Sequence, residues 1–171
     1  SALRRKNASR TILRGCSSVA KYRVFKESYG KSVDRLSCTV RASSHFDPKR
    51  NGDFMGIWDT GAQVSAVSPA VAEKLALSPV DSWEVYGVNG TASLPVVLVD
   101  LRLPNNHRME SVYAVVADIG GGDILLGMNA ITQGDFLVTN KNRQPELTFV
   151  VPPLEDRPDL YRTATKINHS Q

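Results

Sequence analysis

The sequence has little of what builds metal centres and disulfide frameworks. It contains two cysteines, Cys16 and Cys38, and neither belongs to a Cys-x-x-Cys ligand pair. Its three histidines, His45, His107 and His169, are scattered without metal-ligand spacing, so we expect them in solvent-facing turns and in the tail. These absences argue against a patterned zinc site. We expect two ordinary thiols, with a Cys16–Cys38 bridge as the alternative.

Long apolar runs are also missing. No segment approaches the roughly 18–20 residues that a membrane-spanning helix requires, and no secretory apolar region opens the chain. The composition, 42% hydrophobic and 22% charged, is that of a globular protein. A length of 171 residues suits one domain with tails and needs no disulfide or metal to hold its core.

Acidic residues are nearly absent from the N-terminal segment. Residues 1–35 carry ten Lys or Arg against two acids, a charge of +8, and residues 36–171 carry eleven against fifteen, a charge of −4. We assign residues 1–31 to a basic arm, which three interpretations fit: a targeting or linker segment, a pro-segment or interface arm, and a nucleic-acid arm. Nucleic-acid binding is the least favoured because no aromatic residues interleave with the charges.

The remaining chain alternates short apolar runs with Gly, Pro and Asn turns, which predicts an all-β closed barrel with one or two short helices over residues 32–153. Residues 154–171 form a C-terminal tail with one or two helical turns. We expect about eight strands in all. The elements predicted within the domain are strands at 32–43, 54–58, 83–86, 94–103, 112–116, 124–126, 135–139 and 146–151, and a helix from Pro69, capped by Ser68 and stopped by Pro79.

The most informative stretch runs from Phe54 to Ser65. An apolar strand leads directly into Asp59, Thr60 and Gly61. Aspartate is a poor strand residue, and a following glycine frees the backbone, so an acid at this point needs a reason. We interpret Asp59 as a catalytic carboxylate. A capping acid in a plain β-barrel is the alternative.

The ordered set of motifs resembles the retropepsin-type aspartic proteases, the single-lobed, retroviral-like branch of the pepsin fold. Asp59-Thr60-Gly61-Ala62 matches the family signature, and a helix follows it. The hairpin at 86–91 lies where the family keeps its flap, and Ile124-Leu125-Leu126-Gly127 matches the second motif, whose glycine packs behind the catalytic loop. The resemblance covers about residues 33–151. It implies catalytic residues Asp59, Thr60 and Gly61, and substrate-binding residues Ala62, Tyr86, Gly87, Val88, Asn89, Gly90 and Ile124.

Two positions depart from the retroviral pattern. Retroviral enzymes commonly carry an acid just after the signature and an Arg after the second glycine, and these two pair near the dimer contact. This sequence has Gln63 and Met128 there, so it lacks that ion pair. These two departures argue against the retroviral mode of dimer formation.

The resemblance implies an aspartic endopeptidase that needs no cofactor or metal. Its chemistry uses two carboxylates that share one proton, and this chain has a single Asp-Thr-Gly. We therefore expect a symmetric homodimer with Asp59 from each copy, acting on extended peptides or proteins with apolar residues at the cut. The rival hypothesis is a silent retropepsin-fold module that dimerises or grips peptides without turnover.

Other features have structural interpretations. The glycines at 120–122 lack a following Gly-Lys-Ser/Thr and are expected to form a turn, not a phosphate loop. Ser65 and Ser68 sit in no Gly-x-Ser-x-Gly elbow and are expected to have cap or surface roles. Removal of the arm by autoprocessing is a further hypothesis, with cut sites at Leu13, Val19, Val24 and Phe25.

Overall fold

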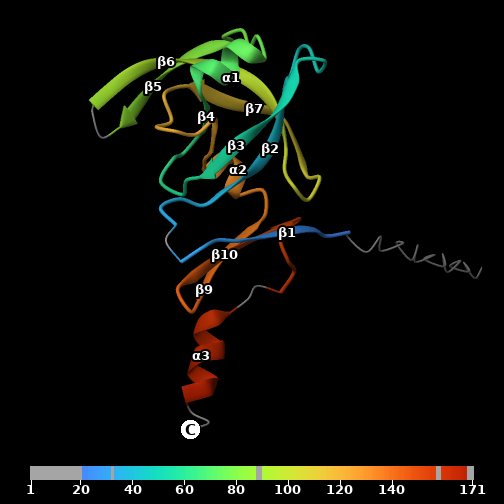
Figure 1. Cartoon of the computed structure of the whole chain (residues 1–171), viewed down its shortest axis with the longest axis vertical. Coiled ribbons are helices and arrows are strands. Elements are labelled where there is room, and N and C mark those ends of the chain that lie inside the picture. The colour runs from blue at the N-terminus through green and yellow to red at the C-terminus, as the bar shows by residue number, and fades with distance from the viewer. Residues whose placement is uncertain (1–20, 32, 88–89, 157–158, 169–171) are drawn as a thin grey trace, which may run out of the picture.

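The computed structural model describes residues 21–31, 33–87, 90–156 and 159–168. Within them lie ten strands and three helices (Figure 1). The strands are β1 (Arg23–Ser28), β2 (Ser37–Ser44), β3 (Asn51–Trp58), β4 (Ser65–Val67), β5 (Asp81–Gly87), β6 (Gly90–Arg102), β7 (Arg108–Val116), β8 (Ile124–Leu126), β9 (Asp135–Lys141) and β10 (Gln144–Val151). The helices are α1 (Pro69–Lys74), α2 (Met128–Ile131) and α3 (Leu160–Asn168).

Six strands close into a barrel, as predicted. The order β2-β3-β8-β4-β7-β6 returns to its start because β6 also pairs with β2, and β5 extends the sheet from the free part of β6. Closure leaves these six strands without a common open edge. In β2, the predicted alternation holds, since Cys38, Val40 and Ala42 are buried and the residues between them are not.

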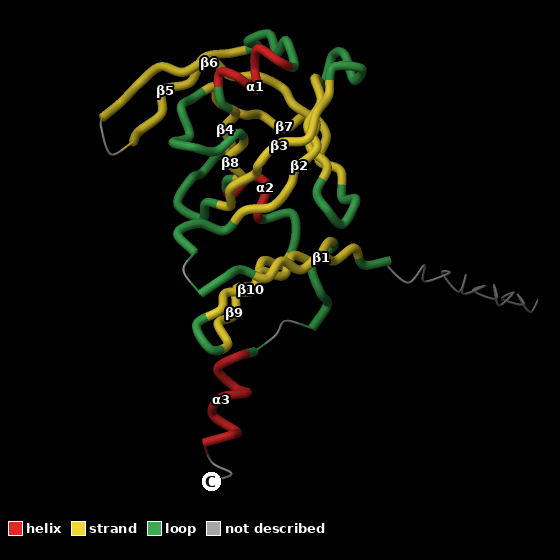
Figure 2. Tube along the Cα trace, in the orientation of Figure 1, coloured by secondary structure: helices red, strands yellow, loops and turns green. Residues whose placement is uncertain are grey.

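A second, three-stranded sheet in the order β1-β10-β9 lies between the barrel and α3 (Figure 2). It joins the barrel through an aromatic cluster in which the Trp58 ring stacks on Phe25 at 6.2 Å and contacts Phe149 at 5.0 Å and Phe136 at 5.3 Å, measured between ring centroids. Trp58 directly precedes Asp59, so this cluster supports the strand that carries the acid.

Strand β1 corrects the expected arm. Residues 23–28 were assigned to a basic segment outside the domain, and the structure pairs all six with β10, from Arg23 opposite Val151 to Ser28 opposite Glu146. Residues 1–20, with Cys16, Leu13 and Val19, lie outside the described residues. Cys38 is a buried free thiol.

Smaller corrections concern the ends of elements. Helix α1 begins at Pro69, and Ser68 Oγ accepts the Val71 N–H at 3.3 Å as predicted, but the helix ends at Lys74, before Pro79. Ala76 at φ 46° turns the chain out of the helix. Strand β2 begins at Ser37 rather than Ser32. The three-residue strand β4 and the four-residue helix α2 were not predicted.

Helix α3 extends away from the small sheet at the end of the molecule opposite the barrel (Figures 1 and 2). It confirms the helical turns expected in the tail. None of the helices in the described part of the chain has the length and apolar character needed to cross a membrane.

Candidate active site

Asp59 leaves the end of β3 as the barrel strand gives way to a loop. Its N–H donates to the Leu126 carbonyl at 3.0 Å, which extends the parallel pairing of Trp58 with Leu126 by one residue. The buried strand thus fixes the backbone of the acid, while its side chain stays half-buried at the barrel surface. A carboxylate in this position is held rigidly and remains within reach of a ligand.

The loop wraps around the carboxylate. The Gly61 N–H donates to Asp59 Oδ1 at 2.8 Å, and the Ala62 N–H donates to the Asp59 carbonyl at 3.3 Å. A Cβ at position 61 would lie 3.1 Å from Asp59 Oδ1, so glycine allows this close approach. One carboxylate oxygen is therefore oriented by the backbone, and Oδ2 has no hydrogen-bond partner among the described residues.

The loop is supported from behind by the start of α2. A Cβ on Gly127 would lie 2.6 Å from the Val64 carbonyl carbon and 2.9 Å from the Ala62 carbonyl oxygen. The Met128 N–H donates to the Ala62 carbonyl at 2.8 Å, and the Asn129 N–H to the Gln63 carbonyl at 3.2 Å. Where retroviral enzymes use an ion pair, backbone hydrogen bonds join the same two segments here.

Ser65 and Asn129 form a buried link that the sequence did not reveal. Ser65 is fully buried, and both its N–H and its hydroxyl donate to Asn129 Oδ1, at 2.9 and 2.8 Å. The Gly127 N–H donates to Ser65 Oγ at 3.2 Å, and Asn129 Nδ2 donates to the Tyr113 carbonyl. The expected surface or cap role of Ser65 is therefore wrong: it ties the Asp59 loop to β7, β8 and α2.

The predicted flap is a hairpin of β5 and β6. Tyr86 pairs with Thr91 and Gly87 with Gly90, and the Tyr86 side chain is 80% exposed. Gly90 has φ 109°, a conformation that suits glycine at this turn. Val88 and Asn89 lie outside the described residues.

The base of the hairpin packs beside the Asp59 loop. Trp83, Val85 and Leu94 belong to a small apolar cluster that also contains Val64 and Leu125. The Trp83 indole donates to Asp81 Oδ2 at 2.9 Å. Hydrogen bonds from the Ser82 N–H and then from this indole lower the pKa of Asp81, so the carboxylate stays charged.

The remaining predicted residues divide into accessible and inaccessible ones. Thr60 and Gly61 are exposed and Ala62 is half-buried, and within the described chain the Thr60 hydroxyl makes no hydrogen bond. Ile124 is completely buried in the main core, so the prediction that it contacts substrate is wrong. In β8, the side chain of Ile124 points into the core, and the neighbouring Leu125 is partly exposed.

Residues 50–130 match the family model described as aspartyl protease. This part of the chain is thus similar to the aspartyl protease family. The matched region runs from the start of β3, through the Asp59 loop and the β5–β6 hairpin, to Ala130 in α2. Together with the six-stranded barrel and its single Asp-Thr-Gly loop, it makes the chain retropepsin-like.

Solved structures similar to this chain include a retropepsin-like aspartic protease from Rickettsia conorii, at 14% identity and a TM-score of 0.46, covering 77% of this chain and 96% of that one. The EIAV protease complexed with the inhibitor HBY-793 has 19% identity and a TM-score of 0.43, covering 56% and 84%. The simian foamy virus protease has 14% identity and a TM-score of 0.42, covering 57% and 93%. No curated protein sequence matches the chain.

Proposed function

We propose that this protein is an aspartic endopeptidase that is active as a homodimer, with Asp59 contributed by each copy. The observation that supports this most directly is the geometry of Asp59. Its half-buried carboxylate lies on a loop whose backbone is hydrogen-bonded to β8 and α2, and its Oδ1 accepts the Gly61 N–H at 2.8 Å. The sequence holds one Asp-Thr-Gly, so a single chain supplies half of the required pair. A two-fold axis between the two loops would complete it.

The proposed chemistry is general acid–base hydrolysis. Two carboxylates about 3 Å apart cannot both be ionised, so they share one proton. The charged carboxylate takes a proton from water, the resulting hydroxide attacks the peptide carbonyl, and the protonated carboxyl supports the developing oxyanion. Proton transfer to the leaving amine then breaks the C–N bond. The pKa values belong to the pair and not to either acid.

Thr60 is the exposed loop residue whose role requires the dimer. The Thr60 hydroxyl, which is exposed and without a partner in the described chain, would hydrogen-bond across the axis to the loop of the second copy. That contact would set the distance between the two acids. The backbone bonds of Ala62 and Gln63 to α2 would keep each loop in place without the retroviral ion pair.

The substrate would lie extended beneath the hairpin, adding main-chain hydrogen bonds as a strand does. The flap around Tyr86 to Gly90 would close over it and exclude water. The half-buried apolar side chains beside the catalytic loop, Val64, Val85 and Leu125 among them, replace Ile124 as candidates for the pockets. Their character supports a preference for apolar residues at the cut.

The first prediction tests this function. Asp59→Asn should abolish cleavage of an apolar peptide library, because an amide cannot accept the proton from water. Its thermal unfolding should stay close to that of the wild type, since the amide oxygen still accepts the Gly61 N–H. Cleavage by both proteins would reveal a contaminating protease. If neither the wild type nor Asp59→Asn cleaves a peptide between about pH 4 and 7, although the protein is a confirmed dimer, the rival hypothesis of a catalytically silent dimerisation or peptide-binding module is correct.

A further inference from the structure

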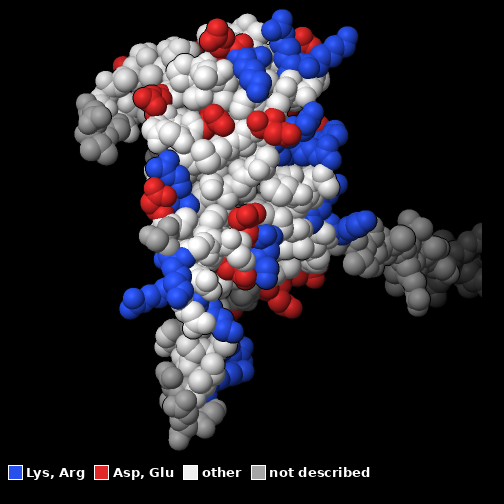
Figure 3. Space-filling model, viewed as in Figure 1, with Lys and Arg blue, Asp and Glu red and all other residues white. Residues whose placement is uncertain are grey.

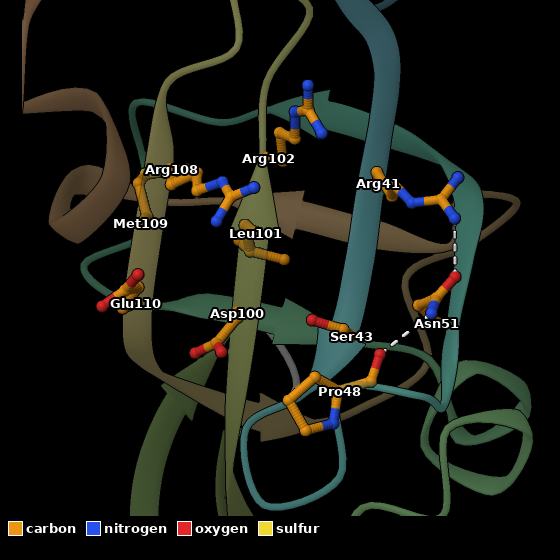
Figure 4. A pocket seen from close by; sticks show the side chains of 10 residues that line it. All are labelled: Arg41, Ser43, Pro48, Asn51, Asp100, Leu101, Arg102, Arg108, Met109 and Glu110. Carbon is orange, nitrogen blue, oxygen red and sulfur yellow. Dashed lines mark hydrogen bonds between the residues drawn. The ribbon is translucent and has the colours of Figure 1, made fainter.

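A cavity of about 330 Å³ lies on the outer face of the barrel, over β2, β6 and β7 (Figure 4). It is separate from the catalytic loop. Arg41, at one end of the cavity, pairs in register with Asp53 of β3, which is six residues from Asp59. At about 3.3 Å per residue, that separation is roughly 20 Å along the strand.

A row of three arginines forms one end of the cavity. In register, Arg41 lies opposite Arg102 on β6, and Arg102 lies opposite Arg108 on β7. Like charges directly opposite one another in a sheet are destabilising. An arrangement of this kind therefore suits a site that receives a negative charge.

The three arginines are unequally neutralised. Arg41 forms an ion pair with Asp53 at 3.2 Å and a hydrogen bond to Asn51, and Arg102 donates to Asn106. Arg108 has neither a hydrogen bond nor an ion pair within the described residues. Its side chain reaches from β7 toward β6 in Figure 4, while Arg41 turns away toward Asn51. Arg102 and Arg108 thus lack a counter-ion among the residues that the structure describes, and Arg108 lacks a hydrogen-bond partner there as well.

A second row, two residues further along the strands, is acidic. Ser43 of β2 lies opposite Asp100 of β6, and the exposed Glu110 lines the cavity from β7. Glu110, like Arg108, has no ion pair in the part of the chain described. Two residues along a strand span about 6.6 Å, which separates the basic row from the acidic one. Figure 3 shows Lys and Arg side chains interspersed with acidic ones over the barrel.

Asp100 is held in place by its neighbours. His45 Nδ1 lies 2.9 Å from Asp100 Oδ1, and the Ser111 N–H donates to the same oxygen at 2.8 Å. Ser111 Oγ lies 3.2 Å from His45 Nε2 and 3.4 Å from His45 Nδ1. Because it is almost equally far from both ring nitrogens, it is not aligned with the lone pair of either one. A nucleophilic serine would need that alignment, so this cluster is not a catalytic pair. The cluster instead stabilises the irregular pairing of β6 with β7, whose register shifts between Val99 and Leu101. Ser111 has φ 55° at this irregularity.

We propose that this cavity binds an extended peptide segment carrying an acidic and a basic side chain two residues apart. In an extended chain, residues i and i+2 lie on one face about 6.6 Å apart, which matches the spacing of the two rows. The acid would approach Arg108, and the base would approach Glu110 and Asp100. The volume suits two side chains, and the two acids disfavour a polyanion such as nucleic acid. This site goes beyond the proposed function and does not depend on it.

The experiment measures binding of end-capped, fluorescent pentapeptides to Asp59→Asn protein by anisotropy. The probe is Ser-Glu-Ser-Lys-Ser, and the comparison peptides are Ser-Glu-Ser-Glu-Ser and Ser-Lys-Ser-Lys-Ser. We expect the probe to bind roughly tenfold more tightly than either, and Arg108→Glu to weaken it by at least about tenfold. Arg108→Glu should also reverse the preference toward the dibasic peptide. Arg23→Glu, the same charge change on exposed β1, is the matched control.

Several results would overturn the proposal. Equal losses in Arg108→Glu and Arg23→Glu would mean that only net charge matters. A dianionic peptide that binds as well as the mixed one, or a ten-nucleotide oligothymidine that binds better, would make the surface a general anion patch or a nucleic-acid site. Arg108→Glu should fold normally because it removes a repulsion, and its circular dichroism melt verifies this.

Discussion

Gly127 leaves no space for a side chain between α2 and the Asp59 loop. A methyl group added there would lie 2.6–2.9 Å from backbone atoms of Val64 and Ala62, which cannot rotate away as the end of a side chain could. Any substituent must therefore move the loop that carries Asp59. The role of this residue is to allow two backbones to meet.

Gly127→Ala should lower the free energy of unfolding by about 1–3 kcal/mol and reduce activity by about a hundredfold. Urea unfolding and kcat/KM with an apolar peptide measure the two effects. Gly30→Ala is the matched control, because nothing lies within 4 Å of its added methyl. Equal behaviour of the two variants would show that the loop tolerates displacement.

Cys38 and Tyr29 make stability sensitive to alkaline pH. Burial raises the pKa of the Cys38 thiol from 9.0 to about 12, and burial is also the main cause that raises the pKa of Tyr29 from 10.0 to about 12. Both groups keep their protons longer in the folded state than in the unfolded state. The unfolded state therefore binds fewer protons at high pH, and stability falls as pH rises.

The free energy of unfolding should be flat below about pH 9 and decline from there toward pH 12. Cys38→Ala should make this decline shallower, with Tyr29 supplying what remains. Urea titrations at a series of pH values between about 8 and 11 would measure both slopes. Identical slopes in wild type and variant would show that the thiol does not contribute.

Among the elements, β1 depends on a single buried side chain. Only Phe25 of its six residues is buried, and it contacts Trp58 and Phe149 in the aromatic cluster. Phe25→Ala should cost about 3–5 kcal/mol and release the strand from the small sheet. Val24→Ala, on the exposed face of the same strand, should change stability by less than about 0.5 kcal/mol. Thermal melts and proteolysis within residues 21–31 measure the two variants.

The same strand explains where sequence reasoning stops. The β2–β3 hairpin, α1, the β5–β6 hairpin and β8 were predictable because each has alternation, a cap, or turn residues within a few positions. In β1, the burial of one residue in six produces no periodic pattern, and charges at Arg23, Lys26 and Glu27 suggest an arm. Its strand conformation follows from pairing with β10, more than 110 residues away.

The candidate site divides in the same way. Asp59 could be singled out from the sequence because its signal, an acid followed by a glycine at the end of an apolar strand, is local. The Ser65–Asn129 link joins residues 64 positions apart and has no local signal beyond the asparagine two positions after Gly127. Ile124 was assigned to substrate from a motif, but only the pairing of β3 with β8 determines which face of β8 points inward.

At the scale of the whole molecule, the proposed chemistry requires two copies. A chain of 18.7 kDa should sediment at about twice that mass, and an inhibitor that spans both acids, such as pepstatin, should shift the equilibrium toward the dimer. Analytical ultracentrifugation of the wild type with and without pepstatin measures this. A monomer at all concentrations, with or without the inhibitor, would contradict the shared dyad.

Autoprocessing of the arm is also limited by the fold. Val24 and Phe25 were expected cut sites, but both are paired with β10 and would have to leave the sheet to enter a cleft in extended form. Cleavage, where it occurs, is therefore expected among residues 1–22. The N-terminus found after long incubation of wild type beside Asp59→Asn tests that hypothesis, and identical N-termini would contradict it.

The parallel pairing of β3 with β8 also affects the order in which parts of the chain fold. It joins Gly56 to Ile124 and bonds the Asp59 N–H to the Leu126 carbonyl, contacts that close a loop of more than 65 residues. Contacts so distant in the chain form slowly and late in folding. Before β8 has been synthesised and paired, the Asp59 loop lacks its hydrogen bond to the Leu126 carbonyl. Under the proposed function, proteolytic activity should therefore appear only after the barrel has closed.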